Sequence, residues 1–300
     1  MAITLNQLAS FLAVAREGSV STAAQKLFVT QPSISAAVSA LAKEVGAELI
    51  ERDGRGIALT PAGEALRPFA ADVLGLIEEG KLAAREAADA SERRLRILAV
   101  ATAGEFLLPW LLKSFGALHP EIDLVLEVAN RATLFQRLLE HDADIAIAGR
   151  PPDDARIAGE AFLKNELVLI TAPDDPLAGM RTVAPARLAE RTWLQREEGS
   201  GTRQLVGEFL AAHELSPKTL TLGSNGAVKQ AVQIGLGVSL QSRLAVGQDL
   251  EAGTLAEIKV RGGLPQRSWY ALRPSAIPAR PSVQSFLEFL KDKENTMDRR

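Results

Sequence analysis

Cysteine is absent from this chain of 300 residues. Its absence excludes a disulfide scaffold, a thiolate metal site and a cysteine nucleophile. No apolar run reaches the length of a membrane span. No basic-then-apolar leader with a small-residue cleavage site begins the sequence. We therefore expect a cytoplasmic protein that has no membrane partner.

The chain also lacks surplus positive charge, because its net charge is −3. That balance argues against a protein that coats nucleic acid regardless of sequence. Residues 1–60 contain five basic and five acidic side chains. Phosphate contacts in that segment must depend on local placement of charge, and affinity for DNA would need help from a second copy of the domain.

Signatures of catalysis are missing as well. The spacing of the three histidines, His119, His141 and His213, does not suggest a metal pair. Ser200 lies in Gly-Ser-Gly-Thr and not in the G-x-S-x-G elbow of a hydrolase, and no phosphate-loop motif occurs. We predict no catalytic residue, no metal and no cofactor, and an enzyme is kept only as a weaker alternative.

A helix-turn-helix pattern is present between Ser19 and Leu41. Thr30 is suited to cap the second helix, and a proline in its first turn costs no hydrogen bond. Apolar positions at helical spacing can pack behind this helix while its polar face reads base edges in a major groove. A helical hairpin that only packs a core is the alternative. The residues predicted to contact DNA here are Ser21, Thr22, Thr30, Gln31, Pro32, Ser33, Ser35 and Ser39.

A short hairpin follows, with its turn at residues 53–56. Arg52 and Arg55 flank that turn, and arginines at the tip of such a wing contact backbone phosphate. A solvated hairpin without a DNA role is the alternative. Thr60, which caps the next helix, completes the predicted DNA-binding residues.

The segment from Pro61 to about residue 90 predicts one long helix with an apolar stripe. The stripe consists of Leu66, Phe69, Val73, Leu76 and Ile77. A long helix with an apolar face and no partner in its own small domain usually meets a copy of itself. We predict a linker and dimerisation helix, with a simple interdomain spacer as the alternative.

Strands and helices alternate from residue 95 onward, which predicts an α/β region with a mostly parallel sheet. One helix is expected over residues 104–118. Two cycles of similar size predict two lobes, one formed by residues 92–162 and 267–293 and the other by residues 163–266. Residues 294–300 are predicted to form a flexible tail.

Polar segments follow several of the predicted strands. Ligands of open α/β sheets gather at the carboxyl ends of strands, so these segments mark a binding cleft. Residues 199–202 also open a helix, whose free amides and hydroxyls suit an anion. The expected ligand is a small anionic metabolite, either a carboxylate or a sugar phosphate. Its candidate contacts are Thr102, Ala103, Gly104, Asn130, Arg131, Gly149, Arg150, Ser200, Gly201, Thr202, Arg203, Ser224 and Asn225.

Residues 11–63, FLAVAREGSVSTAAQKLFVTQPSISAAVSALAKEVGAELIERDGRGIALTPAG, resemble without gaps the winged helix-turn-helix of LysR-type transcriptional regulators. The remaining chain resembles the effector-binding domain of that family, a two-lobed α/β module similar to periplasmic binding proteins. Strings such as LPWLLKSFGALHPEIDLVLEVANRATLFQRLLEHDADIAIAGRPP and EEGSGTR are similar to regulators of carbon-dioxide-fixation (RuBisCO) operons.

The resemblance implies a DNA-binding domain at residues 1–60, a linker helix at 61–91 and an effector-binding domain at 92–293. It implies a regulator that binds promoter DNA as a homodimer, with two dimers joining as a tetramer, and RNA polymerase is a candidate partner. A solute-binding protein is the alternative. Many family members carry an arginine soon after the serine pair, where this chain has Ala36 and Ala37. Base readout would therefore fall on Gln31, Ser33 and Ser39.

Overall fold

The computed structural model describes residues 3–54, 56–89 and 92–297, with side chains up to residue 292. The chain divides into two compact units, which are described separately. The first unit comprises residues 1–88 with the short segments 139–142 and 276–280, and the second comprises the remainder. Within the described residues, no helix combines the length and the apolar character that crossing a bilayer requires.

Three helices form the head of the first unit, namely α1 (Leu5–Glu17), α2 (Val20–Lys26) and α3 (Gln31–Val45). Side-chain caps and glycines define the ends of these helices. Ser19 and Thr30 each accept a hydrogen bond from a backbone N–H of the first turn that follows. Gly18 and Gly46 end α1 and α3 in the left-handed conformation, with φ of 61° and 79°.

The core of the head lies where the three helices meet. Phe11 and Leu41 are fully buried and Ile34 is 1% exposed. These side chains pack in one cluster with Leu49, which lies just before the wing. The apolar spacing of α3 thus places the inner face of this helix as predicted.

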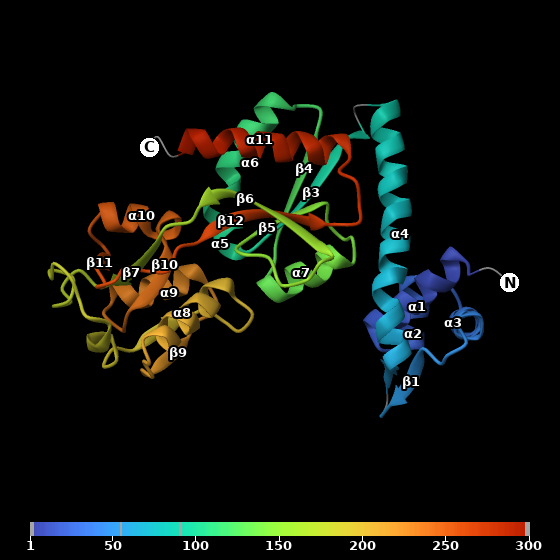
Figure 1. The fold of residues 1–300 in the computed structure, drawn as a ribbon, viewed down its shortest axis with the longest axis horizontal. Coiled ribbons are helices and arrows are strands. Elements are labelled where there is room, and N and C mark those ends of the chain that lie inside the picture. Colours follow the sequence, from blue (N-terminus) through green and yellow to red (C-terminus); the bar gives the residue numbers. More distant parts are fainter. Residues whose placement is uncertain (1–2, 55, 90–91, 298–300) are drawn as a thin grey trace. The chain divides into compact units, whose positions relative to one another are not determined.

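The predicted wing is an antiparallel pair, β1 (Ile50–Asp53) and β2 (Gly56–Leu59). The long helix α4 (Pro61–Ala88) follows, and Figure 1 shows it as one continuous helix. The hydroxyl of Thr60 accepts from the backbone N–H of Gly63 at 3.1 Å. Phe69, Val73 and Leu76 on the predicted stripe are 68%, 42% and 41% exposed, so a single chain leaves this face uncovered.

The first lobe of the second unit contains a five-stranded sheet in the order β4–β3–β5–β12–β6. Its strands are β3 (Arg94–Ala99), β4 (Asp123–Val128), β5 (Ile145–Ala148), β6 (Ile157–Lys164) and β12 (Ser268–Pro274). The helices of this lobe are α5 (Ala101–Phe106), α6 (Leu108–Leu118), α7 (Arg131–Leu139) and α11 (Pro281–Met297). Helix α11 packs along the sheet against β3 and β6 (Figure 1).

The second lobe has a three-stranded sheet, β10–β7–β11, and a parallel pair, β8–β9. Its strands are β7 (Leu167–Thr171), β8 (Trp193–Gln195), β9 (Thr219–Thr221), β10 (Ser239–Ser242) and β11 (Ala256–Ile258). Its helices are α8 (Gly201–Ala212), α9 (Asn225–Gln233), α10 (Arg243–Glu251) and the 3₁₀ turn η2 (Pro185–Leu188). Trp193 is fully buried in the core of this lobe, and its ring lies 5.6 Å from that of Phe209.

The prediction of a mostly parallel sheet is wrong for much of this unit. In the five-stranded sheet β3 pairs in parallel with β4 and β5, whereas β12 runs antiparallel to β5 and β6. In the second lobe β7 is antiparallel to both of its neighbours. Strand β12 brings the chain back from the second lobe. It begins beside the carboxyl end of β5 and therefore runs in the opposite direction.

Two helix boundaries also differ from the prediction. The helix expected over residues 104–118 is two helices, α5 and α6, because Pro109 has no N–H to donate to the backbone oxygen of Glu105 and its ring crowds that preceding turn. Helix α11 continues to Met297 and does not end before residue 294, since Lys, Glu and Met near its end are good helix formers.

Candidate DNA-reading face and effector cavity

The first candidate site is the outward face of α3. Gln31, Pro32, Ser33, Ser35 and Ser39 are all exposed. On the opposite side of the same helix, Ile34 and Val38 are at most 3% exposed and belong to the core of the head. The helix therefore presents a polar row to solvent, as a helix that reads a major groove must.

Hydrogen bonds hold the start of this face in place. The side-chain amide of Gln31 donates to the hydroxyl of Ser21 at 3.0 Å, which ties α3 to α2. The hydroxyls of Thr30 and Ser33 lie 2.8 Å apart. Thr22 is half-buried on α2. These contacts restrict rotamers before any partner binds, which lowers the entropic cost of recognition.

The wing places Arg52 on exposed β1, as predicted, while Arg55 lies outside the described residues. Thr60 differs from the prediction of a DNA contact. Its hydroxyl donates to the backbone oxygen of Glu48 at 2.6 Å and accepts from Gly63, so it is engaged inside the domain. Thr60 directly precedes α4, and this position favours a helix cap over a phosphate contact.

The second candidate site is a cavity of about 190 Å³ lined by residues of both lobes of the second unit. This volume is below the roughly 300–1,000 Å³ of sites for drug-sized ligands, so a small molecule fits best. Among the predicted residues, it is lined by Thr102, Asn130, Arg131, Ser200, Gly201 and Thr202.

The helix start at Ser200 gives this cavity its polar end. Gly199 has a φ of +80°, a conformation that glycine adopts readily, and the chain turns there into α8. The Ser200 hydroxyl accepts from the backbone N–H of Thr202 at 3.3 Å. The first amides of α8 and the buried Thr202 side chain thus lie at the positive end of a helix dipole.

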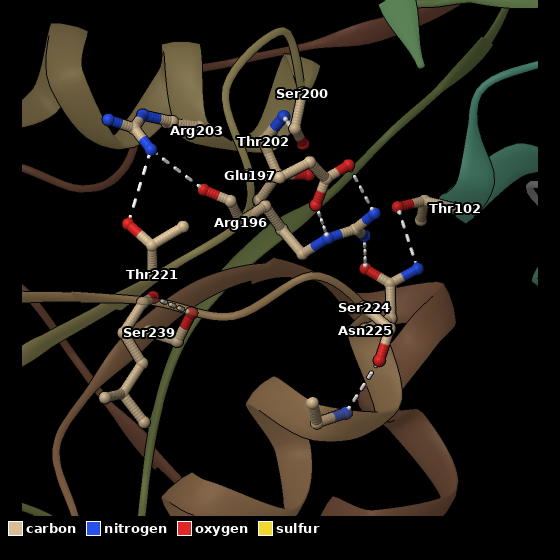
Figure 2. Close-up of polar contacts among 12 residues, drawn as sticks. Thr102, Arg196, Glu197, Ser200, Thr202, Arg203, Thr221, Ser224, Asn225 and Ser239 are labelled. Atoms are coloured by element: carbon tan, nitrogen blue, oxygen red, sulfur yellow. Dashed lines mark hydrogen bonds and ion pairs between the residues drawn. The ribbon is translucent and has the colours of Figure 1, made fainter. Parts of the chain in front are cut away.

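A hydrogen-bond network backs the cavity on the side of α9 (Figure 2). Buried Arg196 forms a two-armed contact with Glu197, at 2.7 and 2.9 Å, and also donates to the side-chain oxygen of Asn225. The Asn225 amide donates to Glu105 at 2.9 Å and approaches the Thr102 hydroxyl at 3.5 Å. Asn225 therefore orients Thr102 from behind and does not itself line the cavity.

Several predicted contacts lie elsewhere. Ala103 and Gly104 are buried inside α5, and Arg150 lines a second, larger cavity of about 1,770 Å³. Arg203 donates to the backbone oxygen of Arg196 and to Thr221, and Ser224 caps α9 through the N–H of Ala227 (Figure 2). Gly149 contacts the Arg267 side chain and is not part of the lining.

Sequence reasoning missed Arg196, Glu197, Arg267 and Trp269 in the lining. The first two directly follow β8, so the rule that ligands gather at strand ends could have found them. Arg267 and Trp269 lie at the start of β12, which reaches the cavity only because this strand runs antiparallel to β5.

Positive charge dominates the side of the cavity near β12. Burial, together with the neighbouring charge of Arg131, lowers the pKa of Arg267 to about 10, while the carboxylate of Glu208 acts in the opposite direction. Burial also lowers the pKa of Arg131. Both shifts report that these guanidinium groups lose solvation without full compensation.

The fold and these two sites define a class of protein, a DNA-binding regulator with a small-molecule domain. Residues 5–64 match the bacterial regulatory helix-turn-helix protein of the lysR family, and residues 88–295 match the LysR substrate binding domain. The chain belongs to the LysR family of transcriptional regulators.

Curated relatives agree with that assignment. The RuBisCO operon transcriptional regulator of Acidithiobacillus ferrooxidans is 37% identical, over 96% of this chain and 93% of its own length. The HTH-type transcriptional activator CmpR of Synechocystis is 34% identical, over 96% of this chain and 94% of its own. These matches confirm the predicted resemblance and the prediction of a regulator instead of an enzyme.

Solved structures share the fold. The CcmR regulatory domain of Synechocystis PCC6803 in complex with 2-PG is 30% identical, with a TM-score of 0.65, over 68% of this chain and 98% of that chain. Full-length CbnR complexed with its target DNA has a TM-score of 0.57 at 21% identity, over 97% of this chain and 99% of that one.

Proposed function

We propose that this regulator reads promoter DNA with the exposed polar face of α3 and responds to a small anionic metabolite bound in the 190 Å³ cavity. One observation carries the proposal for DNA. Gln31, Ser33, Ser35 and Ser39 form an exposed row on a helix whose other face is buried in the head. Direct readout requires this arrangement, because only an exposed row can reach base edges.

The anionic class of the metabolite is supported by the start of α8. Its free amides, the hydroxyls of Ser200 and Thr202 and the hydroxyl of Thr102 provide several donors at one end of the cavity. The structural neighbour CcmR was solved with 2-PG (2-phosphoglycolate), a small anion of this kind. An operon for carbon-dioxide fixation is the proposed target, from the names of the relatives.

Assembly belongs to the same proposal. The exposed stripe on α4, with Phe69, Val73 and Leu76, supports a homodimer in which two such helices cover one another. A tetramer built through the effector domains and a contact with RNA polymerase remain predictions from family resemblance. As a regulator of chromosomal genes, the protein would act in the cytoplasm.

Fluorescence anisotropy on two labelled duplexes tests the DNA part. One duplex carries the promoter region next to the gene of this protein, and the other has the same composition in scrambled order. Gln31→Ala should weaken binding to the promoter by about tenfold and leave the scrambled duplex unchanged, since a lost base contact costs about 1–3 kcal/mol. Gln25→Ala, an exposed amide on α2, is the matched control and should change neither.

The metabolite part is tested on the same promoter duplex with 2-phosphoglycolate. Thr202→Val removes one hydroxyl from the cavity while keeping its shape, so promoter affinity should stay and the response to the anion should disappear. A response that persists in Thr202→Val would move the metabolite site elsewhere. No binding of the wild-type protein to its own promoter at low salt would refute the regulator proposal.

A further inference from the structure

Helix α7 starts at the cavity of about 190 Å³, which Asn130 and Arg131 both line. The backbone N–H of Arg131 donates to the backbone oxygen of Gly199 at 3.2 Å, in the turn that opens α8. Asn130 caps α7, because its side-chain oxygen accepts from the backbone N–H of Thr133 at 2.9 Å. A molecule bound in the cavity therefore meets the first turn of α7.

The body of α7 is a short helix that is fixed along its length. Leu134 and Leu138 are fully buried on its inner side. On its outer side Arg137 pairs with Glu127 of β4 at 2.8 Å. The nine residues of this helix span about 13 Å, at 1.5 Å per residue. A helix of this length with such anchors moves as one piece.

The other end of α7 leads directly into the first unit, to which residues 139–142 belong. The carboxylate of Glu140 lies 3.0 Å from a guanidinium nitrogen of Arg16 on α1. Its other oxygen lies 3.1 Å from a guanidinium nitrogen of Arg67 on α4. The Glu140 side chain is 16% exposed. One carboxylate thus joins the first helix of the head to the long helix.

The next residue, His141, interlocks with α4. A Cβ atom on Gly75 would lie 2.8 Å from Nδ1 of His141 and closer still to two of its ring carbons, so a larger residue there would displace the ring. Nε2 of His141 lies 3.0 Å from a carboxylate oxygen of Asp72 on α4. His141 has a φ of 57°, which a residue other than glycine keeps only where its surroundings fix it. This seat on α4 is therefore specific.

We infer that α7, together with Glu140 and His141, forms a coupling rod, the α7 rod, between the cavity and the DNA-reading head. This inference rests on the proposed function and adds the route by which the response travels. A ligand at the start of α8 displaces Arg131, and α7 passes the displacement to Glu140. The angle between α1 and α4 then changes, and α3 follows because it packs against α1. A rigid element that contacts both sites is a physical basis for such coupling.

Anisotropy on the promoter duplex, with and without 2-phosphoglycolate, tests the α7 rod. The change in promoter affinity that the anion causes measures the coupling, and in wild type it should be about fivefold or more. Glu140→Gln and Gly75→Ala should each reduce this change to less than about twofold, because both detach the rod from the head. Calorimetry should find their affinity for 2-phosphoglycolate, measured without DNA, within about threefold of wild type.

Two matched controls should respond as wild type does. Glu160→Gln neutralises a glutamate that pairs with Lys291 inside the second unit. Gly80→Ala adds a methyl group to α4 where space is open, and it raises helix propensity as Gly75→Ala does. Amide hydrogen exchange of residues 31–45 reports that the head of each variant is folded, since a partly exposed ion pair contributes little to stability.

A double-mutant cycle on promoter affinity tests the rod without a ligand. Asn130→Ala removes the cap of α7 at the cavity end, and Glu140→Gln detaches the rod at the head end. Substitutions more than about 10 Å apart normally have additive effects. The α7 rod predicts instead that Asn130→Ala changes promoter affinity by about threefold in wild type and by less than about 1.5-fold in Glu140→Gln.

The outcomes separate the α7 rod from the proposed function. Loss of the response with 2-phosphoglycolate binding intact, and a non-additive cycle, support the rod. A response that persists in Glu140→Gln and Gly75→Ala overturns the rod and leaves the metabolite site in place. If 2-phosphoglycolate does not bind wild type, or binds without changing promoter affinity, the proposed metabolite response fails and the cycle alone decides. Additive effects in the cycle overturn the rod whatever the anion does.

Discussion

Phe28 lies in the turn between α2 and α3 and combines two unfavourable features. Its φ is 55°, in the left-handed region, and its ring is 96% exposed. A residue other than glycine pays roughly 1–2 kcal/mol in that region, whereas asparagine tolerates it far better. Because the exposed ring contributes almost no burial, Phe28→Asn should raise the free energy of unfolding of the head by about 0.5–1 kcal/mol.

Two further variants separate backbone strain from side-chain effects. Phe28→Gly relieves the same strain, but the greater freedom of glycine in the unfolded chain offsets a gain of about 0.4–1 kcal/mol. Phe28→Leu keeps the strain and should leave stability within about 0.5 kcal/mol of wild type. The expected order of stability is therefore asparagine above glycine, with leucine close to phenylalanine.

All three tryptophans, Trp110, Trp193 and Trp269, lie in the second unit, so intrinsic fluorescence does not report on the head. Amide hydrogen exchange of residues 31–45 does. Phe28→Asn should slow exchange of these amides by about two- to fivefold, which corresponds to the expected free energy. Faster exchange in Phe28→Asn, or equal slowing in Phe28→Leu, would refute the strain argument. A parallel loss of promoter affinity would instead assign the ring a DNA contact.

Three further changes test other features. Gly63→Ala places a methyl group against the backbone oxygen of Leu49 and should destabilise the head by about 1–3 kcal/mol, seen as faster exchange in α3, whereas Gly80→Ala in the same helix has open space and should not. Arg52→Ala on the wing should weaken promoter and scrambled duplexes alike and lower the salt slope by about one; a loss restricted to the promoter would contradict a phosphate contact. Arg267 lines the cavity and attracts an anion only while its guanidinium is charged, so affinity for 2-phosphoglycolate should fall as the pH passes about 10, and calorimetry on Arg267→Gln should not show this fall.

The head was predictable because its determinants are local. Thr30 was predicted to fix the start of α3 through a contact within a few residues, and the structure has it in that role, with Ser19 and Gly46 fixing other helix ends in the same local way. The apolar spacing of α3 likewise decided which side chains would be buried and which would face solvent. A reader of the sequence needed no long-range information for this part.

The cavity was predictable only in part, since its far wall depends on the direction of a distant strand. Thr102, Ser200 and Thr202 lie where a helix begins, and the sequence alone predicts these helix starts. Arg267 and Trp269 are separated from them by more than sixty residues and become neighbours through the antiparallel pairing of β12 with β5. Neither apolar periodicity nor strand length specifies that direction.

Hydrogen bonding explains why other predicted contacts were misplaced. Arg203 and Asn225 have polar side chains near the starts of α8 and α9. Their positions in the sequence alone therefore favour contact with the ligand. The structure uses them internally, Arg203 with Thr221 and Asn225 with Arg196. Whether a polar group faces a ligand or a neighbouring side chain depends on partners far away in sequence.

The bare face of α4 has a consequence for how the regulator responds to its own abundance. In the homodimer proposed above, Phe69, Val73 and Leu76 gain shelter from water by intermolecular contact, so the sheltered fraction follows mass action. Dilution should then loosen this helix, and a rise in copy number should tighten it. Expression level would thereby set the conformational stability of the protein as well as its quantity.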